Sequence, residues 1–504
     1  MTDHSDVESP AEEKKKQEES PDYTARILKG SSSVFSGSIV GKGVGFALQL
    51  VLTRGLGPAL FGIYSYGLTV LRFAREIGTL GFQNGIVRFA SPHYEADEPE
   101  NVKGVFLTAG GLGLGAGLIL GIGLFILSPW LAEWIFQDPG YTHVFQIFAC
   151  GLPFYVFTYL ASRMARALGN MRVDVLLSSI LQPALFLLFV CGLFLLGLGF
   201  TAALYAFLAS TLLAAGASVY AIYRLFPPLF SSLTAEVDVR ALLRFSLPIV
   251  GISLAGTGLT YADRLMLGIL STEKAVGIYQ AAALTSVQLR FILYAITSTF
   301  SPIISDLYHN HKSDALSRLY ADTVRWIITG SLPPAVVLVT FAPEIMSIYG
   351  SGFREGDIAL RILALAYLIV AGSGSVGHML QMSDHQDFAL GVNTVTVLLN
   401  LILNWILIQW YGVMGAALAT AITQALSNIA QLGGLYWFTA IQPFRWNLWK
   451  PVVAASITTG VAMGLYPVLS VPARWLLGIP AVPVLYLGLL LVLGLPPRDQ
   501  SLLE

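Results

Sequence analysis

The sequence predicts an all-α polytopic membrane protein with about fourteen transmembrane helices, and three observations support this fold class. The chain has 504 residues, of which 55% are hydrophobic and only 12% are charged, against roughly 25% charged residues in an ordinary soluble domain. Apolar runs of about 20 residues, the length that crosses a bilayer, recur from Ser32 to the end. The connections between the runs are short, so we expect no globular domain between spans.

The predicted spans follow one another in the order of the apolar runs. They cover residues 32–53, 59–82, 104–127, 142–165, 173–197, 200–223, 244–268, 276–300, 324–348, 359–380, 387–410, 413–437, 449–470 and 474–495. Residues 1–29 are acidic and lysine-rich and contain no apolar core. We therefore expect no cleavable signal peptide there, but a disordered and solvated tail.

The distribution of Lys and Arg predicts the orientation of the chain. Cytoplasmic loops of membrane proteins carry the excess of these cations. If the tail is cytoplasmic, the loops on that side collect most of the Lys and Arg residues, and the opposite side keeps only Arg54, Lys274, Arg354 and Arg474. The sequence therefore predicts a multi-pass protein of the cell membrane with both termini in the cytoplasm.

The chain also repeats itself at an offset of about 215 residues. Gly62-Ile63-Tyr64 recurs as Gly277-Ile278-Tyr279, and at the same offset Arg75 falls on Arg290. Six spans lie between equivalent points, which predicts a parallel repeat of two six-helix lobes with two helices added at the end. Such repeats place the substrate site between the halves.

The repeat divides the sequence into five parts. They are a cytoplasmic tail (1–29), an N-lobe of spans 1–6 (30–223), a cytoplasmic linker (224–243), a C-lobe of spans 7–12 (244–437), and spans 13–14 with a short tail (438–504).

Several charged residues fall inside the predicted spans. A charge at mid-bilayer costs about 2.5–3.5 kcal/mol on insertion scales, so such residues tend to face a bundle interior or a wet cavity. Cations exceed acids here, and an excess of positive charge in a low-dielectric cavity selects an anion. Arginine also matches the oxygens of a phosphate with its planar donor fork. The cations are Lys42, Arg72, Arg75, Arg264 and Arg290, and the acids are Glu76 and Asp263.

Simpler roles compete with anion binding at some of these positions. Arg72 and Glu76 share a helix face at i, i+4 and could neutralise each other. Arg264 could extend to the aqueous interface. Arg75 and Arg290 have no acidic residue at i±3 or i±4, so this symmetric pair is the strongest candidate for binding a substrate phosphate. Glu76 and Asp263 are candidates for ion coupling.

Polar and aromatic residues suggest contacts to a glycan, although packing explains them as well. Asn393, Asn400 and Asn404 follow one face of span 11, and Gln424, Asn428 and Gln431 follow one face of span 12. Hydrogen bonds between helices account for both stripes. Among the tyrosines, Tyr64 and Tyr279 could stack on sugar rings or belong to an aromatic belt at the interface. Tyr64, Tyr279, Asn400 and Asn404 are the candidate glycan contacts.

The sequence gives no indication of catalysis or of a cofactor. The two cysteines, Cys150 and Cys191, lie in apolar runs, and no Cys/His spacing suggests a metal. There is no GxxxxGK[ST] phosphate loop. We therefore expect a protein without enzymatic activity, metal or cofactor, and no nucleic-acid partner.

Several motifs resemble those of polysaccharide flippases. Asn400-Leu-Ile-Leu-Asn404, followed by Tyr411-Gly-Val-Met-Gly-Ala-Ala-Leu-Ala-Thr420, is similar to the family's signature in spans 11 and 12. The run from Leu56 to Tyr64, and Asp263-Arg264 followed by Gly277-Ile-Tyr279, resemble its junctions of spans 1–2 and 7–8. The chain thus resembles Wzx-type flippases of the multidrug/oligosaccharidyl-lipid/polysaccharide exporter superfamily.

The resemblance implies alternating access of two six-helix lobes around a central cavity. It also implies a polyprenyl-linked oligosaccharide, on an undecaprenyl or dolichyl carrier, that moves from the inner to the outer leaflet. By position, Lys42, Arg72 or Arg75, and Arg290 would hold the (di)phosphate. Other membrane proteins of the glycan pathway are potential partners. The alternative function is a multidrug or small-molecule antiporter on the same fold.

Overall fold

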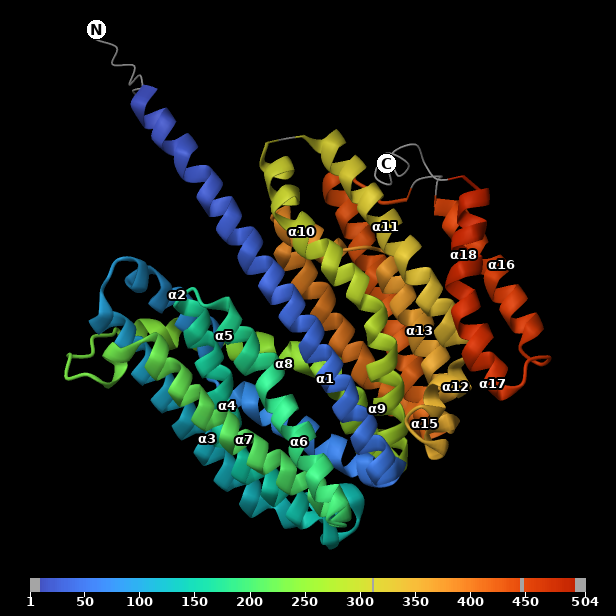
Figure 1. Ribbon diagram of the computed structural model, residues 1–504, viewed down its shortest axis with the longest axis horizontal. Helices are drawn as coiled ribbons and strands as arrows, with labels where there is room; N and C mark the ends of the chain where they lie inside the picture. Colours follow the sequence, from blue (N-terminus) through green and yellow to red (C-terminus); the bar gives the residue numbers. More distant parts are fainter. Residues whose placement is uncertain (1–9, 311, 445–447, 495–504) are drawn as a thin grey trace. The chain divides into compact units, whose positions relative to one another are not determined.

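The computed structural model describes residues 10–310, 312–444 and 448–494, and every regular element in these ranges is helical (Figure 1). Eleven of the described helical stretches are long and apolar enough to cross a membrane, from Ile39–Gly78 to Val471–Val492. The predicted all-α membrane fold is therefore confirmed.

Two helices are too long for a single crossing at about 1.5 Å per residue. They are α1 (Pro10–Gly78) and α15 (Gln386–Thr439). Each contains a glycine outside helical geometry: Gly57 at φ 70°, ψ 176°, and Gly412 at φ 52°, ψ −124°. Each is therefore two helical arms joined at a turn. With these arms and the shorter α16 (Trp449–Leu465), the structure is compatible with fourteen spans.

The chain forms two compact units, which are described separately. Unit 1 contains residues up to Gly55, Leu71–Pro129 and Thr142–Leu254, and unit 2 contains Leu56–Val70, Trp130–Tyr141 and the residues from Ala255. The predicted lobe boundaries remain a prediction. The elements of unit 1 after α1 are α2 (Phe82–Glu95), α3 (Pro99–Phe136), α4 (Thr142–Ala167), α5 (Met171–Val175), η2 (Leu176–Ile180), α6 (Leu181–Leu195), α7 (Gly199–Leu225), η3 (Pro227–Phe230) and the first part of α8 (Val239–Leu270).

Unit 2 contains the remaining helices, and the last of them pack onto its interior. Its elements are η1 (Pro139–Tyr141), α9 (Glu273–Ser286), η4 (Val287–Leu289), α10 (Arg290–His309), α11 (Ser313–Thr340), α12 (Ala342–Ser347), η5 (Ser351–Gly356), α13 (Asp357–Gly372), α14 (Val376–Met382), α15, α16, α17 (Val471–Ala473), η7 (Arg474–Gly478) and α18 (Ile479–Val492).

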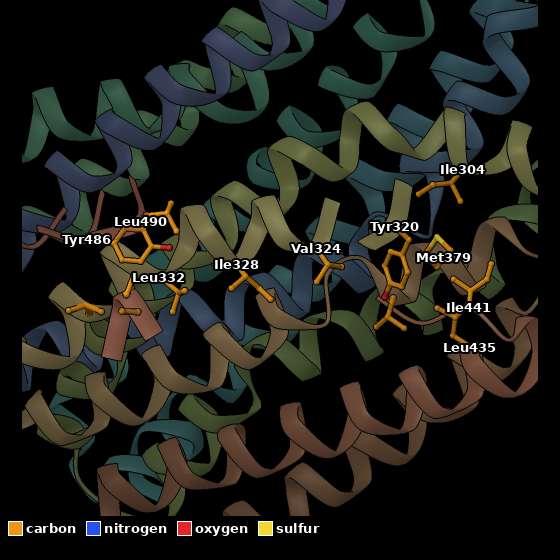
Figure 2. Packing of buried hydrophobic residues seen from close by; sticks show 14 of the residues in the cluster. Ile304, Tyr320, Val324, Ile328, Leu332, Met379, Leu435, Ile441, Tyr486 and Leu490 are labelled. Carbon is orange, nitrogen blue, oxygen red and sulfur yellow. The ribbon is translucent and has the colours of Figure 1, made fainter. Parts of the chain in front are cut away.

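The core of unit 2 is organised around one face of α11. Tyr320, Val324, Ile328 and Leu332 recur every four residues along this face, and Tyr486 of α18 belongs to the same cluster (Figure 2). A period of about 3.6 residues places such side chains on one stripe of a helix. Lipid tails are as apolar as these side chains, so the hydrophobic effect does not hold the cluster together within the bilayer. Close van der Waals packing stabilises it instead. The two C-terminal spans are therefore an integral part of unit 2.

The repeated Gly-Ile-Tyr motif forms a helix crossing inside unit 2. A Cβ atom added at Gly62 would lie 1.8 Å from the carbonyl oxygen of Glu273, and one added at Gly277 would lie 2.0 Å from that of Pro58. Neither position has room for a side chain. The two copies of the motif thus meet at their glycines, where the helix backbones touch.

The expected disorder of the tail is not observed for its described part. Residues 1–9 lie outside the described residues, and α1 begins at Pro10. Residues 10–29 therefore continue the first spanning helix. Alanine, glutamate and lysine are strong helix formers, and residues 10–29 are rich in them. Low hydrophobicity alone did not reveal this preference.

Candidate functional site

Arg75 lies in the last turn of α1, directly before the chain bends at Leu80 and Gly81, both with positive φ. Its guanidinium forms an ion pair with Glu76 and donates a hydrogen bond to the Tyr155 hydroxyl at 3.4 Å. It also lies 5.2 Å and 4.5 Å from the ring centres of Tyr155 and Tyr159 on α4. Arg75 is thus held by aromatic rings within unit 1, and its charge is partly neutralised.

The ion pair between Arg75 and Glu76 joins neighbours in the sequence. A comparison of positions i±3 and i±4 assigns Glu76 to Arg72 and misses this pair. Long side chains one residue apart can still meet beyond the helix surface, because both extend several ångströms from it. Arg72 is half-buried and interacts with Tyr155, and Lys42 is exposed on α1.

Arg290, the predicted counterpart of Arg75, occupies a different electrostatic environment in unit 2. It is the first residue of α10, directly after the 3-10 turn η4 interrupts the predicted span 8. Its guanidinium lies 5.0 Å from the ring centre of Tyr294 and 5.9 Å from that of Tyr367 on α13. Its buried Nε atom has no hydrogen-bond partner, and within the described part of the chain no carboxylate lies within 4.0 Å of the guanidinium.

The two arginines have related surroundings but unequal charge balance. Each lies beside a tyrosine that comes from the helix two spans further along, α4 for Arg75 and α13 for Arg290. The residue after Arg75 is Glu76, whereas the residue after Arg290 is Phe291. Among the described residues, the copy in unit 2 therefore has no acid within ion-pair distance to balance its positive charge.

Arg290 lines a polar cavity of about 420 Å³ formed by α8, η4, α10, α13, α14 and α15. This volume lies in the range of small-molecule sites. Side-chain amides form much of its wall, so the cavity combines one cation with many neutral hydrogen-bonding groups. Its strongly polar side chains are Arg290, His378, Gln381, Asn393, Gln424, Asn428 and Gln431.

Asp263 on α8 is a buried carboxylate surrounded by neutral donors. Its Oδ2 atom accepts hydrogen bonds from the Tyr279 hydroxyl at 2.5 Å and the Thr420 hydroxyl at 2.8 Å. Its Oδ1 atom accepts one from Asn404 Nδ2 at 2.8 Å. No Lys or Arg nitrogen among the described residues lies within 4.0 Å, so hydrogen bonds alone compensate the burial of this acid.

Arg264, next to Asp263, does not reach the aqueous interface. The residue is only 6% exposed, which excludes the extended conformation considered from the sequence. Its Nε donates to Gln280 Oε1 at 2.6 Å, and Nη1 donates to the Thr260 carbonyl oxygen. Arg264 therefore binds to neutral acceptors inside unit 2, and it does not line the polar cavity.

The four candidate glycan contacts are buried. Tyr64 and Tyr279 are 3% and 1% exposed, and Asn400 and Asn404 are 5% and 0% exposed. Asn404 and Tyr279 donate hydrogen bonds to Asp263, and Asn400 donates to Thr423. Tyr279, Asn400 and Asn404 thus belong to an interhelical hydrogen-bond network.

The polar cavity is instead lined by three side-chain amides of the predicted span 12, which we call the amide stripe: Gln424, Asn428 and Gln431. The i, i+4, i+7 spacing of Gln424, Asn428 and Gln431 predicts that these residues share a helix face, and interhelical hydrogen bonds account for such a stripe. Such bonds exist, for example from Gln431 Nε2 to Asn393 Oδ1 at 3.2 Å. The cavity beside them depends on the packing of α10, α13 and α14, which spacing along one helix does not determine.

Comparisons with known proteins agree with this fold. A model of the polysaccharide biosynthesis protein family matches residues 27–308, and a model of the MatE family matches residues 248–406. The solved structure of the lipid II flippase MurJ, in an inward closed conformation, has a TM-score of 0.67 at 14% identity, covering 94% of this chain and all of that one. An inward-facing multidrug resistance MATE family transporter of the MOP superfamily has a TM-score of 0.66 at 15% identity, covering 79% of this chain and 94% of that one.

Two proteins of Haloferax volcanii are similar in sequence. The chain is 26% identical over 253 residues to the probable low-salt glycan biosynthesis flippase Agl15, a match covering 50% of this chain and about half, 52%, of that protein. It is 22% identical over 422 residues to the probable flippase AglR, covering 82% of this chain and 84% of that protein. The motif-based resemblance is confirmed. Since the first family model matches more than half of the sequence, the chain belongs to the polysaccharide biosynthesis protein family.

Proposed function

We propose that this protein is a flippase that moves a polyprenyl-(di)phosphate-linked oligosaccharide from the cytoplasmic to the outer leaflet of the cell membrane. The observation that carries the proposal is Arg290, a cation without an acidic partner in the described residues, in the wall of a polar cavity. A site of this kind favours an anion with hydroxyl groups around it. Agl15 is named as a glycan biosynthesis flippase, MurJ as a lipid II flippase and AglR as a flippase, which supports this proposal.

The charged residues have distinct roles in this proposal. Arg290 makes the main contact with the substrate phosphate in unit 2. Arg264 is a second cation of unit 2, and Lys42, Arg72 and Arg75 are the candidate phosphate-binding cations of unit 1. The glycan occupies hydrated space, while the isoprenoid tail stays in the bilayer. Alternating access then exposes the head group to the opposite side, with both termini cytoplasmic. No bond is formed or broken, so the protein acts as a transporter and needs no cofactor.

The two buried acids are the candidates for coupling to an ion. Asp263 already has three neutral donors within hydrogen-bonding distance, and Glu76 forms an ion pair with Arg75. A proton or cation that binds Asp263 would compete with these donors and loosen the contact between α8, α9 and α15. Glu76 would release Arg75 on protonation. Either acid can thus link ion binding to the position of a helix.

The proposal is tested by replacing the arginines. The variant R290A should slow flipping of a fluorescent polyprenyl-diphosphate oligosaccharide in proteoliposomes by roughly tenfold to a hundredfold, because hydrogen bonds to charged groups contribute about 1.5–3 kcal/mol. The variant R75A should have a smaller effect, since Glu76 already neutralises part of that charge. In cells, R290A should accumulate lipid-linked glycan on the cytoplasmic leaflet.

A matched control removes a cation outside the cavity. Arg354 in η5 is exposed and does not line the cavity, so R354A should flip at the wild-type rate. Wild-type flipping by both R290A and R75A would contradict the proposal.

The second candidate function is a multidrug or small-molecule antiporter. The match to the MatE family and the similar fold of MATE transporters favour it. An antiporter of lipophilic cations would extrude ethidium from loaded vesicles, and the unbalanced Arg290 predicts no such efflux. Ethidium transport without glycan flipping would replace the first proposal by this one.

A further inference from the structure

We infer that the polar cavity of unit 2 binds a sugar phosphate: Arg290 contacts the phosphate, and the amide stripe of α15 recognises the first sugar. The inference rests on the proposed function and deepens it. It assigns substrate recognition to Gln424, Asn428 and Gln431 rather than to the buried residues Asn400 and Asn404.

We place the phosphate at Arg290 because of the surroundings of its guanidinium. The aromatic rings of Tyr294 and Tyr367 fix the guanidinium from the side. Its Nε atom is buried without a hydrogen-bond partner. A guanidinium that lies against two aromatic rings, has an unbonded Nε and has no acid within 4.0 Å among the described residues is suited to a phosphate oxygen pair.

We place the sugar at the amide stripe because of the hydrogen-bonding capacity of its side chains. Each amide offers two donor hydrogens and one acceptor oxygen, which suits sugar hydroxyls that donate and accept. Asn428 uses much of its capacity within the protein, because it accepts from Ser373 at 2.5 Å and donates to the Gln424 carbonyl oxygen at 2.7 Å. The side-chain amide of Gln424 makes no hydrogen bond to any described residue, although it lines the cavity. Of the three amides of the stripe, Gln424 is therefore the most available to a ligand.

An apolar groove adjoins this wall, and its apolar lining is suited to a lipid tail. The groove has a volume of about 630 Å³ and lies on α15, where Phe388, Val395, Leu399 and Ile429 contribute to its lining. Ser427 lines both the groove and the polar cavity. A single ligand that fills both spaces must join a polar, anionic head to an apolar chain. The isoprenoid tail of the substrate is thus the occupant that we assign to the groove.

The two arms of α15 are linked at this wall by side-chain hydrogen bonds. Gln431 Nε2 donates across the arms to Asn393 Oδ1 at 3.2 Å, and within its own arm it donates to Ser427 Oγ at 3.3 Å. These are long, neutral bonds, which contribute little to stability individually. They can open to let the junction between head and tail pass from the groove side to the cavity side.

The test measures binding to the full-length protein in nanodiscs. The probes are inorganic phosphate, a panel of hexose and N-acetylhexosamine 1-phosphates, and the farnesyl phosphosugar of the best binder. We expect at least one sugar 1-phosphate to bind tenfold or more tightly than phosphate, and its farnesyl derivative to bind more tightly still. The variant Q424L should lose the preference for the sugar but keep phosphate binding, whereas R290A should lose both.

The variant Q409L is the matched control, because Gln409 lies on the same helix but is exposed and bonded to the Trp405 carbonyl oxygen. Thermal unfolding of each variant checks that it is folded. The inference is overturned if no sugar phosphate binds better than phosphate, or if Q424L retains the preference. Equal binding of free and farnesyl-linked sugar phosphate would overturn the assignment of the groove.

A flipping assay with the same variants separates this inference from the proposed function. If wild type and Q424L flip lipid-linked glycan equally, the sugar site is wrong and the flippase stands. If Q424L loses sugar binding but wild type flips no lipid-linked glycan, the site stands and the flippase does not.

Discussion

At the scale of single residues, the charge balance of the two arginines distinguishes the two units. The offset of the repeat predicted the pair, and both are found beside tyrosines. Their difference depends on the residue that follows each of them, Glu76 or Phe291. The ion pair of Arg75 and Glu76 joins residues i and i+1, whereas the usual side-chain neighbours on a helix lie at i±3 and i±4. The cavity around Arg290 depends on helices distant in sequence and could not be predicted.

The hydrogen bonds to Asp263 lead to a prediction about stability. Thr420→Val removes one of three donors and leaves the carboxylate buried, so it should lower the free energy of unfolding by about 1–3 kcal/mol. Thermal unfolding in detergent measures the change. In contrast, Thr394→Val removes an exposed hydroxyl on the other arm of α15 that bonds only to the Leu390 carbonyl oxygen, and it should have little effect. Equal stability of the two variants would show that Asp263 does not need Thr420.

At the scale of helices, the sequence predicts the turns between spans but not the short irregular segments within them. The predicted gaps after residues 53 and 410 contain or adjoin the non-helical glycines Gly57 and Gly412. The 3-10 turn before Arg290 and the π-helical segment at Leu176–Ile180 were not predicted. These interruptions keep most backbone hydrogen bonds within the segment, so they need no polar side chains. Their residues remain largely apolar, and hydropathy therefore does not reveal them.

The crossing of the Gly-Ile-Tyr motifs gives a prediction at this scale. Gly277→Ala places a methyl group 2.0 Å from the carbonyl oxygen of Pro58, so the two helices must separate. Overpacking of this kind costs about 1–3 kcal/mol, and a lower unfolding temperature should result. Gly433→Ala is the matched control, since a Cβ there meets no atom within 4 Å. An unfolding temperature for Gly277→Ala equal to that of the control would refute the tight crossing.

At the scale of the whole molecule, the C-terminal spans complete unit 2. Arg474, expected as a loop cation, forms an ion pair with Glu344 at 2.8 Å, and its guanidinium lies 3.8 Å from the ring centre of Tyr466. Tyr466 in turn donates to the same carboxylate at 3.0 Å. This contact fixes the segment between α16 and α18 to α12. Together with the core of Figure 2, it attaches the last helices to unit 2 by polar as well as apolar contacts.

The proposed transport also predicts how the membrane potential distributes the substrate. Moving one negative charge outward is favoured by about 2.3 kcal/mol per 100 mV of inside-negative potential. At equilibrium the cations of the protein return to their starting positions, so only the net charge of the substrate and of coupled ions determines the distribution. In proteoliposomes with a potassium diffusion potential of 100 mV, inside negative, the outer leaflet should gain roughly fiftyfold over the inner leaflet for each net charge. Accessibility of a fluorescent head group to an external quencher measures this ratio, and vesicles without protein give the background. A ratio that does not change with the potential would mean that the transported complex is neutral. Either coupled cations cancel the phosphate charge, or the substrate is not an anion. Repeating the measurement with sodium or the pH gradient removed distinguishes these two cases.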